Sequence, residues 1–449
     1  MEKQKSLFRE FGKYVSFNVA GMVGYSCYIL ADTFFIAKAL GADGLTALNL
    51  ALPLFTFMSG LGLMLGMGGG TRFSIFHSQG QGNRGNQVFT EAVSVGILIA
   101  VLFMGAGLFL AGPISALLGA EDLVYDLTKS YLRIILLFAP LFITNNVLQC
   151  FVRNDGSPGL AMLAMVTGSL ANVLLDYVFM FPLGMGMMGA ALATCMAPAI
   201  SIIILSVRLL RKKGRLHFVK TSFSRHSVKS TSSLGISALI TEVSSGIVII
   251  AFNGLFLNLM GNIAVAAYSI VANLALVIIS IFTGIAQGMQ PLASREYGAG
   301  NWKNSRLAYR WALSLAFLCA ILIYGGLSFF ADPVAAIFNE EGNETLQRLA
   351  VSGLRLYFTA FFFIGFNIVT AAFFSAVEIP RPAFAMAISR GFLVILPCAF
   401  FMAMAFGVTG VWLSFPLAEA LTALLGLIFF RRIFGSGSLG RQKEKKMLK

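Results

Sequence analysis

The sequence predicts an all-α integral membrane protein with twelve transmembrane helices in two six-helix lobes, and three observations support this prediction. The 449 residues are 57% hydrophobic and only 12% charged, with a mean hydropathy of +0.82. Apolar runs of about 20 residues, which is long enough to cross a bilayer, recur along the chain. The second half of the chain repeats the first. The alternation of strand residues that is typical of membrane β-barrels is absent from the sequence.

Each apolar run has a length that fits one membrane-spanning helix. An even number of spans places both termini on the same side of the membrane. The twelve predicted spans are residues 14–38, 46–70, 88–112, 130–151, 158–182, 186–209, 234–258, 262–288, 307–330, 350–374, 380–404 and 407–431.

The basic residues gather in the loops on one side of this topology. That side carries both termini, the 71–87 loop, Arg153 in the next loop, the 208–233 and 289–306 loops and the 375–381 turn. Cytoplasmic loops of membrane proteins carry an excess of Lys and Arg, so both termini are predicted to be cytoplasmic. Of the 33 Lys and Arg residues, the opposite side keeps only Lys38, Lys129, Arg133, Arg348 and Arg355.

A basic segment at 210–233 separates the two predicted lobes. The N-terminal lobe is assigned to 1–209, the C-terminal lobe to 234–431 and a basic cytoplasmic tail to 432–449. The topology requires a basic cytoplasmic loop at the segment's position. We therefore interpret it as a linker that lies against anionic lipid headgroups, and not as a nucleic-acid site, despite the net charge of +14.

The internal repeat predicts how the two lobes are related. Each half holds an even number of spans, so the two copies cross the membrane in the same direction. They are then related by a pseudo-two-fold axis along the membrane normal, as in parallel-repeat transporters. The matched pairs are Gly70 with Gly288, Gly80 with Gly298, Asn83 with Asn301, Arg133 with Arg355, Pro158 with Pro380, Gly186 with Gly407 and Gly189 with Gly410.

Polar side chains inside the fifth and sixth spans predict a functional site. Asn172 and Asp176 are four residues apart, so they lie on one face of a helix. Thr194 follows after a Pro- and Gly-containing break, and Asp32 lies deep in the first span. An ionisable side chain at membrane depth is costly and is a functional candidate by default. The alternative is a polar cluster that joins helices by hydrogen bonds.

The four residues offer oxygen atoms to a cation. A carboxylate in a low-dielectric cavity gains affinity for a proton, because desolvation disfavours its charged form. A sodium ion would instead satisfy the charge through Asp32, Asn172, Asp176 and Thr194. The sequence leaves the choice between H⁺ and Na⁺ open. No other metal site is predicted, because the cysteines form no C-x-x-C pair and the histidines lie in polar loops.

Three further ionisable residues lie within predicted spans of the C-terminal lobe. Glu242 is a carboxylate within the seventh span. Glu419 in the twelfth is a candidate for the lining of a substrate cavity, with hydrogen bonding between helices as the alternative. We expect Arg390 to extend its guanidinium toward the cytoplasm in preference to neutralising a carboxylate.

The chain resembles the multidrug and toxic compound extrusion (MATE) family, and within it the bacterial MepA-like branch. The resemblance covers about Val15 to Arg432. It rests on Asp32 before TFFIAKALGA, on Asn172 with Asp176, on Thr194, on the loop copies GQGN and PLASREYGAGN, and on TEVSSGIV around Glu242.

The resemblance implies a cation-coupled antiporter that exports amphipathic, often cationic organic compounds across the cytoplasmic membrane of a bacterium by alternating access. It further implies that Asp32, Asn172, Asp176 and Thr194 form the cation or proton site of the N-terminal lobe. Some members use an acidic residue of the seventh span in the C-terminal lobe, which makes Glu242 a second candidate for coupling. Some family members add an aspartate on the tenth span, where this chain offers Asn367, which with Glu419 is a candidate for the lining of the substrate cavity. No cofactor beyond the coupling ion is expected. A monomer suffices, since two lobes already enclose a pathway.

A lipid-linked oligosaccharide flippase of the same superfamily is the alternative. Its cavity should be rich in Arg and Lys to hold a pyrophosphate, whereas this chain keeps most basic residues in loops. An enzyme is disfavoured because the sequence has no H-E-x-x-H, P-loop or G-x-S-x-G motif.

Overall fold

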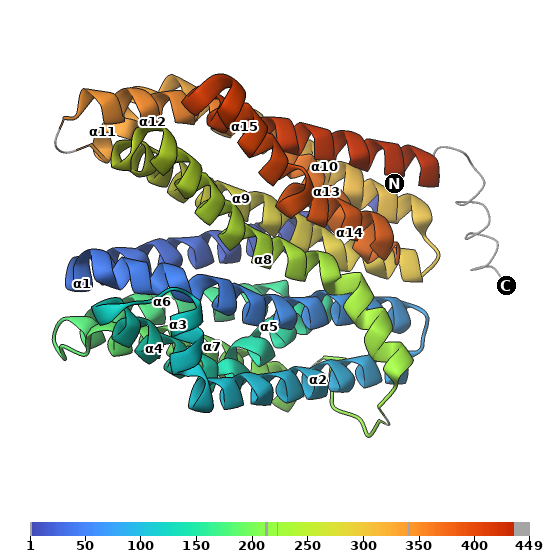
Figure 1. Ribbon diagram of the computed structural model, residues 1–449. Helices are drawn as coiled ribbons and strands as arrows, with labels where there is room; N and C mark the ends of the chain where they lie inside the picture. Colours follow the sequence, from blue (N-terminus) through green and yellow to red (C-terminus); the bar gives the residue numbers. More distant parts are fainter. Residues whose placement is uncertain (1, 212–213, 222, 340–341, 435–449) are drawn as a thin grey trace.

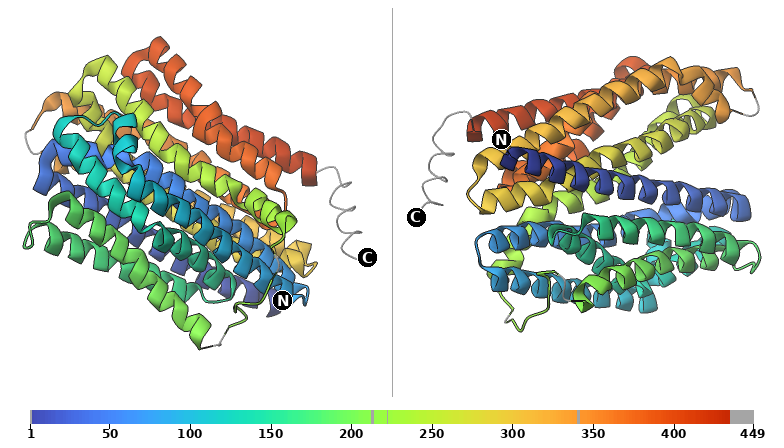
Figure 2. Two further views of the ribbon diagram at one scale, coloured as in Figure 1. Left: turned by 60° about the horizontal axis from the view of Figure 1, so that its bottom comes forward. Right: turned by 180° about the vertical axis from the view of Figure 1, so that it is seen from behind.

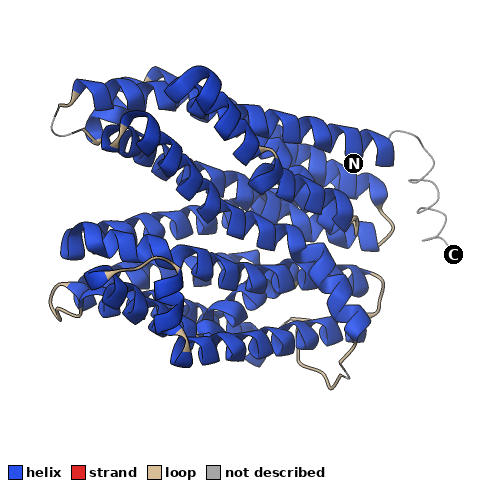
Figure 3. Ribbon diagram, in the orientation of Figure 1, coloured by secondary structure: helices blue, strands red, loops and turns tan. Residues whose placement is uncertain are grey.

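A computed structural model describes residues 2–211, 214–221, 223–339 and 342–434. Helices form two lobes, one below the other in Figure 1. In the described ranges no strand occurs (Figure 3). Most of the predicted tail at 432–449 lies outside the described residues.

The described part of the N-terminal lobe forms seven helices. The first is two spans joined at Gly41, whose φ of 62° suits glycine because other residues rarely adopt it. The helices are α1 (Glu2–Ser78), α2 (Gly82–Phe109), α3 (Ala111–Leu117), α4 (Asp122–Leu137), α5 (Ala139–Asn154), α6 (Pro158–Met180) and α7 (Gly186–Leu210).

The C-terminal lobe begins with α8, which starts at Arg225 inside the segment assigned to the linker. Ser224 caps this helix by accepting a hydrogen bond from the Ser227 amide, so the polar residues that follow it are helical. The elements are α8 (Arg225–Met260), α9 (Asn262–Gly298), α10 (Trp302–Phe329), α11 (Ala331–Ile337), α12 (Glu344–Tyr357), the 3₁₀ turn η1 (Phe358–Ala360), α13 (Phe361–Ala376), α14 (Pro380–Ile388), the π-helical turn η2 (Ser389–Leu393) and α15 (Ile395–Phe434).

These helices supply the twelve predicted spans. Nine continuous helical segments in the described chain are long and apolar enough to cross a membrane, and the pair α4 and α5, bent by 52°, makes a tenth. Two of the ten each contain a glycine break, at Gly41 and Gly407, that divides them into two spans. The predicted fold class is confirmed.

The backbone preserves the internal repeat at the turns between spans. Glycines with positive φ recur in both halves, Gly41 with Gly261 and Gly186 with Gly407. The pairing of Gly80 with Gly298 is wrong by two residues. Gly80 (φ 75°) corresponds instead to Gly300 (φ 77°). Each of these glycines lies two residues before the first residue of the next helix. Matching small residues by identity had shifted the register of this loop.

The two lobes approach each other at one end of the molecule, called here the termini end because α1 starts and α15 stops there. Figures 1 and 2 show the lobes diverging toward the opposite end. Between them α1 packs against α8 and α9. Glycines allow this close approach: a Cβ at Gly68 would overlap the Thr231 carbonyl oxygen, and one at Gly288 would lie 2.7 Å from the Val15 Cα.

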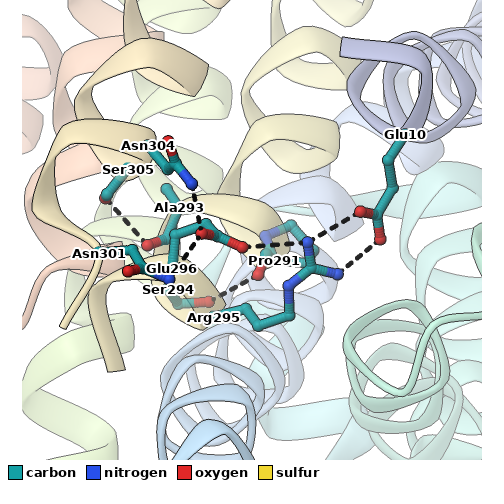
Figure 4. A network of polar contacts seen from close by, with 9 residues as sticks. All are labelled: Glu10, Pro291, Ala293, Ser294, Arg295, Glu296, Asn301, Asn304 and Ser305. Atoms are coloured by element: carbon teal, nitrogen blue, oxygen red, sulfur yellow. Dashed lines mark hydrogen bonds and ion pairs between the residues drawn. The ribbon is translucent and has the colours of Figure 1, made fainter. Parts of the chain in front are cut away.

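An ion pair also joins the lobes at the termini end. Arg295 of α9 binds the carboxylate of Glu10 on α1 through both terminal guanidinium nitrogens, at 2.5 and 2.8 Å. Its second carboxylate neighbour is Glu296, at 3.2 Å. Figure 4 shows Arg295 between these two residues, while Asn301 and Asn304 donate to Glu296 from the next turn and helix.

Candidate functional site

The structure brings the four predicted residues of the N-terminal lobe together. Asp32 on α1 is 7% exposed, Asn172 and Asp176 on α6 are 0% exposed, and Thr194 on α7 is 4% exposed. The carboxyl groups of Asp32 and Asp176 are close enough to interact directly. Tyr131 of α4 completes the group, with its hydroxyl beside Thr194.

Local sequence features produce this arrangement. The four-residue spacing of Asn172 and Asp176 stacks both side chains on one face of α6. Small residues then let α6 and α7 pack closely: a Cβ at Gly168 would lie 2.9 Å from the Ala197 carbonyl oxygen, and one at Gly189 would lie 3.0 Å from the Phe179 Cβ. Thr194 is thereby held near the polar face of α6.

Most polar atoms of this cluster lack a hydrogen-bond partner. They are one carboxylate oxygen of Asp32, both carboxylate oxygens of Asp176, and both the oxygen and the nitrogen of the Asn172 amide. The Thr194 hydroxyl donates to the Ala190 carbonyl at 2.9 Å, which leaves its lone pairs available. An unsatisfied buried polar group costs about 1–3 kcal/mol, and more when it is charged. The donor set suits a proton shared between the carboxylates, or a small hard cation bound by oxygen atoms.

In the described part of the C-terminal lobe, the positions that correspond to Asp32 and Thr194 hold aromatic residues. A shift of 220 residues, set by Gly41 and Gly261, relates Asp32 to Phe252. A shift of 221, set by Gly186 and Gly407, relates Thr194 to Phe415. Both belong to an aromatic cluster in which Phe252 stacks on Tyr268 at 5.6 Å and Phe415 on Tyr357 at 4.3 Å. The fold repeats, but the polar chemistry of the site does not.

Asn367 and Glu419 form a separate network inside the C-terminal lobe. The Asn367 amide donates to the Glu419 carboxylate at 2.6 Å and to its backbone carbonyl at 2.9 Å. Arg390 binds the other carboxylate oxygen at 2.9 and 3.1 Å. The expectation that Arg390 extends toward the cytoplasm is wrong. It lies in the π-helical turn η2 and neutralises Glu419 instead. The role of Asn367 and Glu419 in substrate binding stays a prediction.

Replacing Glu419 with glutamine should destabilise the protein, because the guanidinium of Arg390, whose side chain is only 13% exposed, would be left without its counter-ion. Loss of one partner of a buried pair costs about 3–5 kcal/mol. We expect a lower melting temperature in detergent for Glu419→Gln and an unchanged one for Glu344→Gln, which removes an exposed pair with Arg348. Loss of export at an unchanged melting temperature would instead assign Glu419 to the substrate pathway.

Glu242 lies between the lobes, apart from the N-terminal cluster. It is half-buried on α8, and a Cβ at Gly60 of α1 would lie 3.2 Å from its Cβ. Glu242 has no ion-pair partner among the residues that the structure describes. A change in the distance between α1 and α8 would therefore change the surroundings of the Glu242 carboxylate.

Sequence reasoning missed Arg153, which was counted with the basic loops. The structure places it at the end of α5, 2% exposed, where it donates to Asn18 of α1 at 2.8 Å and to Gln287 of α9. It thus joins helices of both lobes. The sequence run QCFVRN gave one indication that Arg153 is buried, because this single arginine directly follows an apolar stretch of helix.

The comparisons with known proteins agree with this architecture. The family model described as MatE matches residues 19–178 and 236–401, which is more than half of the chain. The chain belongs to the MatE family. The predicted resemblance to this family is confirmed. The MepA-like branch that the sequence predicted agrees with the names of the curated relatives of this MatE protein.

Two such relatives are multidrug export proteins named MepA. That of Staphylococcus saprophyticus subsp. saprophyticus is 25% identical over 429 residues, which cover 93% of each chain. That of Staphylococcus aureus strain MRSA252 is 26% identical over 410 residues, covering 89% of this chain and 88% of the relative. A solved multidrug resistance MATE family transporter of the MOP superfamily, in an outward-facing conformation, matches with a TM-score of 0.88 at 22% identity, over 98% of this chain and 96% of that one. That structural likeness shows the shared fold.

Proposed function

We propose that the protein exports amphipathic organic compounds, cationic ones among them, from the cytoplasm in exchange for H⁺ or Na⁺. The observation that carries this proposal is the cluster of Asp32, Asn172 and Asp176, whose buried polar atoms lack hydrogen-bond partners. Asp32 and Asp176 form no ion pair with any residue that the structure describes, so a bound cation or proton would lower the electrostatic cost of the two carboxylates. Membership of the MatE family and the names of the MepA relatives support export as the process.

Coupling requires that the cation and the substrate each favour a different conformation. The helix that carries Asp32 supplies a physical link between site and lobe interface. Its first span also carries Val15 and Val19, which face Gly288 and Gly284 of α9. From Asp32 to Val19 the distance along the helix is about 20 Å at 1.5 Å per residue. A change in the position of α1 on cation binding would therefore alter its packing against the other lobe.

The arrangement of the lobes corresponds in this proposal to the state that is open to the outside. The termini end carries the excess of basic residues and is assigned to the cytoplasm of a bacterium. The contacts between lobes through Gly68, Gly288 and Arg295 lie at this end. Alternating access would break them and close the opposite end. The pathway between two lobes of one chain needs no second subunit, so the proposed active form is a monomer.

Ethidium efflux from vesicles tests this function, with a pH gradient or a sodium gradient imposed alone. One of the two gradients is expected to drive efflux, which would identify the coupling ion. No efflux under either gradient, with the protein confirmed in the membrane, would contradict the proposal and favour the flippase. A flippase is disfavoured here because the buried Arg153 and the partly buried Arg390 are engaged by other side chains and do not cluster.

A further inference from the structure

A groove lies between the first turns of α8 and α14 at the termini end. Its volume is about 400 Å³. In Figure 1 the two helices lie side by side, near the right-hand end and toward the viewer, and they pack against each other. The spans run from left to right in this view, so this side of the C-terminal lobe faces the surrounding lipid. The residues that line the groove include Lys229, Ser232, Ser233, Ile236, Arg381 and Phe384.

The lining changes from basic to apolar in the direction that enters the membrane. Along α8 the order is Lys229, then Ser232 and Ser233, then Ile236; along α14 it is Arg381, then Phe384. Both helices start at the termini end, so the two gradients are parallel. Lys229 and Ile236 are about 10 Å apart along the helix axis at 1.5 Å per residue. A phospholipid has the same order, with a phosphate at the interface and acyl chains below it.

The charge of the groove favours an anionic occupant. Lys229 and Arg381 are exposed, and neither forms an ion pair in the described part of the chain. The described lining contains no acidic residue, and Arg225 adds a further exposed basic group in the first turn of α8. Basic pockets between transmembrane helices on the cytoplasmic side bind anionic headgroups.

We propose that this groove is a binding site for an anionic phospholipid. The phosphate binds Lys229 and Arg381, the hydroxyl groups of Ser232 and Ser233 donate to the headgroup oxygens, and an acyl chain lies along Ile236 and Phe384. The zwitterionic lipid phosphatidylcholine is bound more weakly, because its net charge is zero.

The same turns of α8 hold the lobes together. The Arg72 guanidinium of α1 donates to the Ser227 carbonyl and hydroxyl at 2.8 and 2.9 Å and to the Thr231 hydroxyl at 3.2 Å. Lys229, Ser232 and Ser233 belong to this stretch but line the groove. A lipid in the groove therefore restrains the segment of α8 that Arg72 contacts, and stabilises the contact between lobes at the termini end.

The test uses the purified full-length protein in micelles that contain equal amounts of phosphatidylglycerol and phosphatidylcholine. Native mass spectrometry measures how much of each lipid stays bound. The wild type is expected to retain phosphatidylglycerol preferentially, and the double variant Lys229→Gln/Arg381→Gln to bind it about 30-fold more weakly, from the usual contribution of two basic residues near an anionic lipid. The control Arg211→Gln/Lys220→Gln removes two exposed basic residues outside the groove and should bind as the wild type does.

A second variant tests whether lipid binding depends on the shape of the groove and not only on its positive charge. Ser233→Trp fills the groove without changing its charge and is expected to lower phosphatidylglycerol retention while phosphatidylcholine retention stays constant. Inorganic phosphate at the same concentration should not displace the lipid, because it lacks the acyl chain. Equal losses in the groove and control double variants, wild-type retention by Ser233→Trp, or displacement by phosphate would each overturn the proposal. None of these readouts depends on transport.

Discussion

Asp176→Asn is expected to reduce gradient-driven efflux to the level of vesicles without the protein. The substitution keeps the size of the side chain but removes a charge that the coupling cation would neutralise. It also removes repulsion between neighbouring carboxylates, so the variant should fold and reach the membrane at least as well as the wild type. Efflux of a fluorescent organic cation and the amount of protein in the membrane are measured together.

Two companion variants decide whether this loss belongs to the site. Asp32→Asn removes the neighbouring carboxylate and should have the same effect. Asp43→Asn makes the same chemical change at an exposed position and should transport normally. Wild-type efflux by Asp176→Asn would contradict the assignment of the site, and loss of efflux by Asp43→Asn would show that the effect is not specific.

Gly68→Ala is expected to destabilise the closed arrangement of the termini end. The added Cβ would overlap the Thr231 carbonyl oxygen, and both partners belong to helix backbones that cannot shift independently. Overpacking of this kind costs about 1–3 kcal/mol, which moves a two-state equilibrium by roughly 5–150-fold. Thr71, three residues along α1 from Gly68, is 1% exposed and accepts a hydrogen bond from Gln290 of α9. A cysteine introduced by Thr71→Cys should therefore react with a membrane-impermeant thiol reagent faster when Gly68→Ala is also present.

The matched control for this experiment is Gly325→Ala, because a Cβ at Gly325 meets no atom within 4 Å. It should leave the reaction rate of the introduced cysteine unchanged. The protein without Thr71→Cys gives the background from the five native cysteines. An equal rate with and without Gly68→Ala would show that the contact between α1 and α8 does not keep this end closed.

The fold could be predicted because the membrane imposes a simple length requirement. Each span needs about 20 apolar residues, and the chain supplies twelve such runs. The N-terminal cluster could also be anticipated. Asn172 and Asp176 share a face through helix periodicity alone, and the break before Thr194 returns α7 alongside α6. Asp32 was identified as their partner because it lies deep within the first predicted span.

Other features depend on contacts that the sequence does not reveal. The π-helical turn η2 directs Arg390 toward Glu419, and regular helix periodicity does not anticipate such a turn. Arg153 was counted as a loop residue because its partners Asn18 and Gln287 lie on helices far away in sequence. The register of the repeat at Gly300 is set by backbone conformation, which residue identities obscure.

The most direct test of the coupling site measures cation release when substrate binds to the purified protein. If cation and substrate favour different conformations, adding substrate must displace the cation. In weakly buffered solution without sodium the measurement reports protons, and in sodium-containing solution it reports sodium ions. The wild type should release one of the two in proportion to the substrate bound, and Asp176→Asn should release neither. Substrate binding without release of either ion, or undiminished release from the variant, would contradict a coupling site at Asp32 and Asp176.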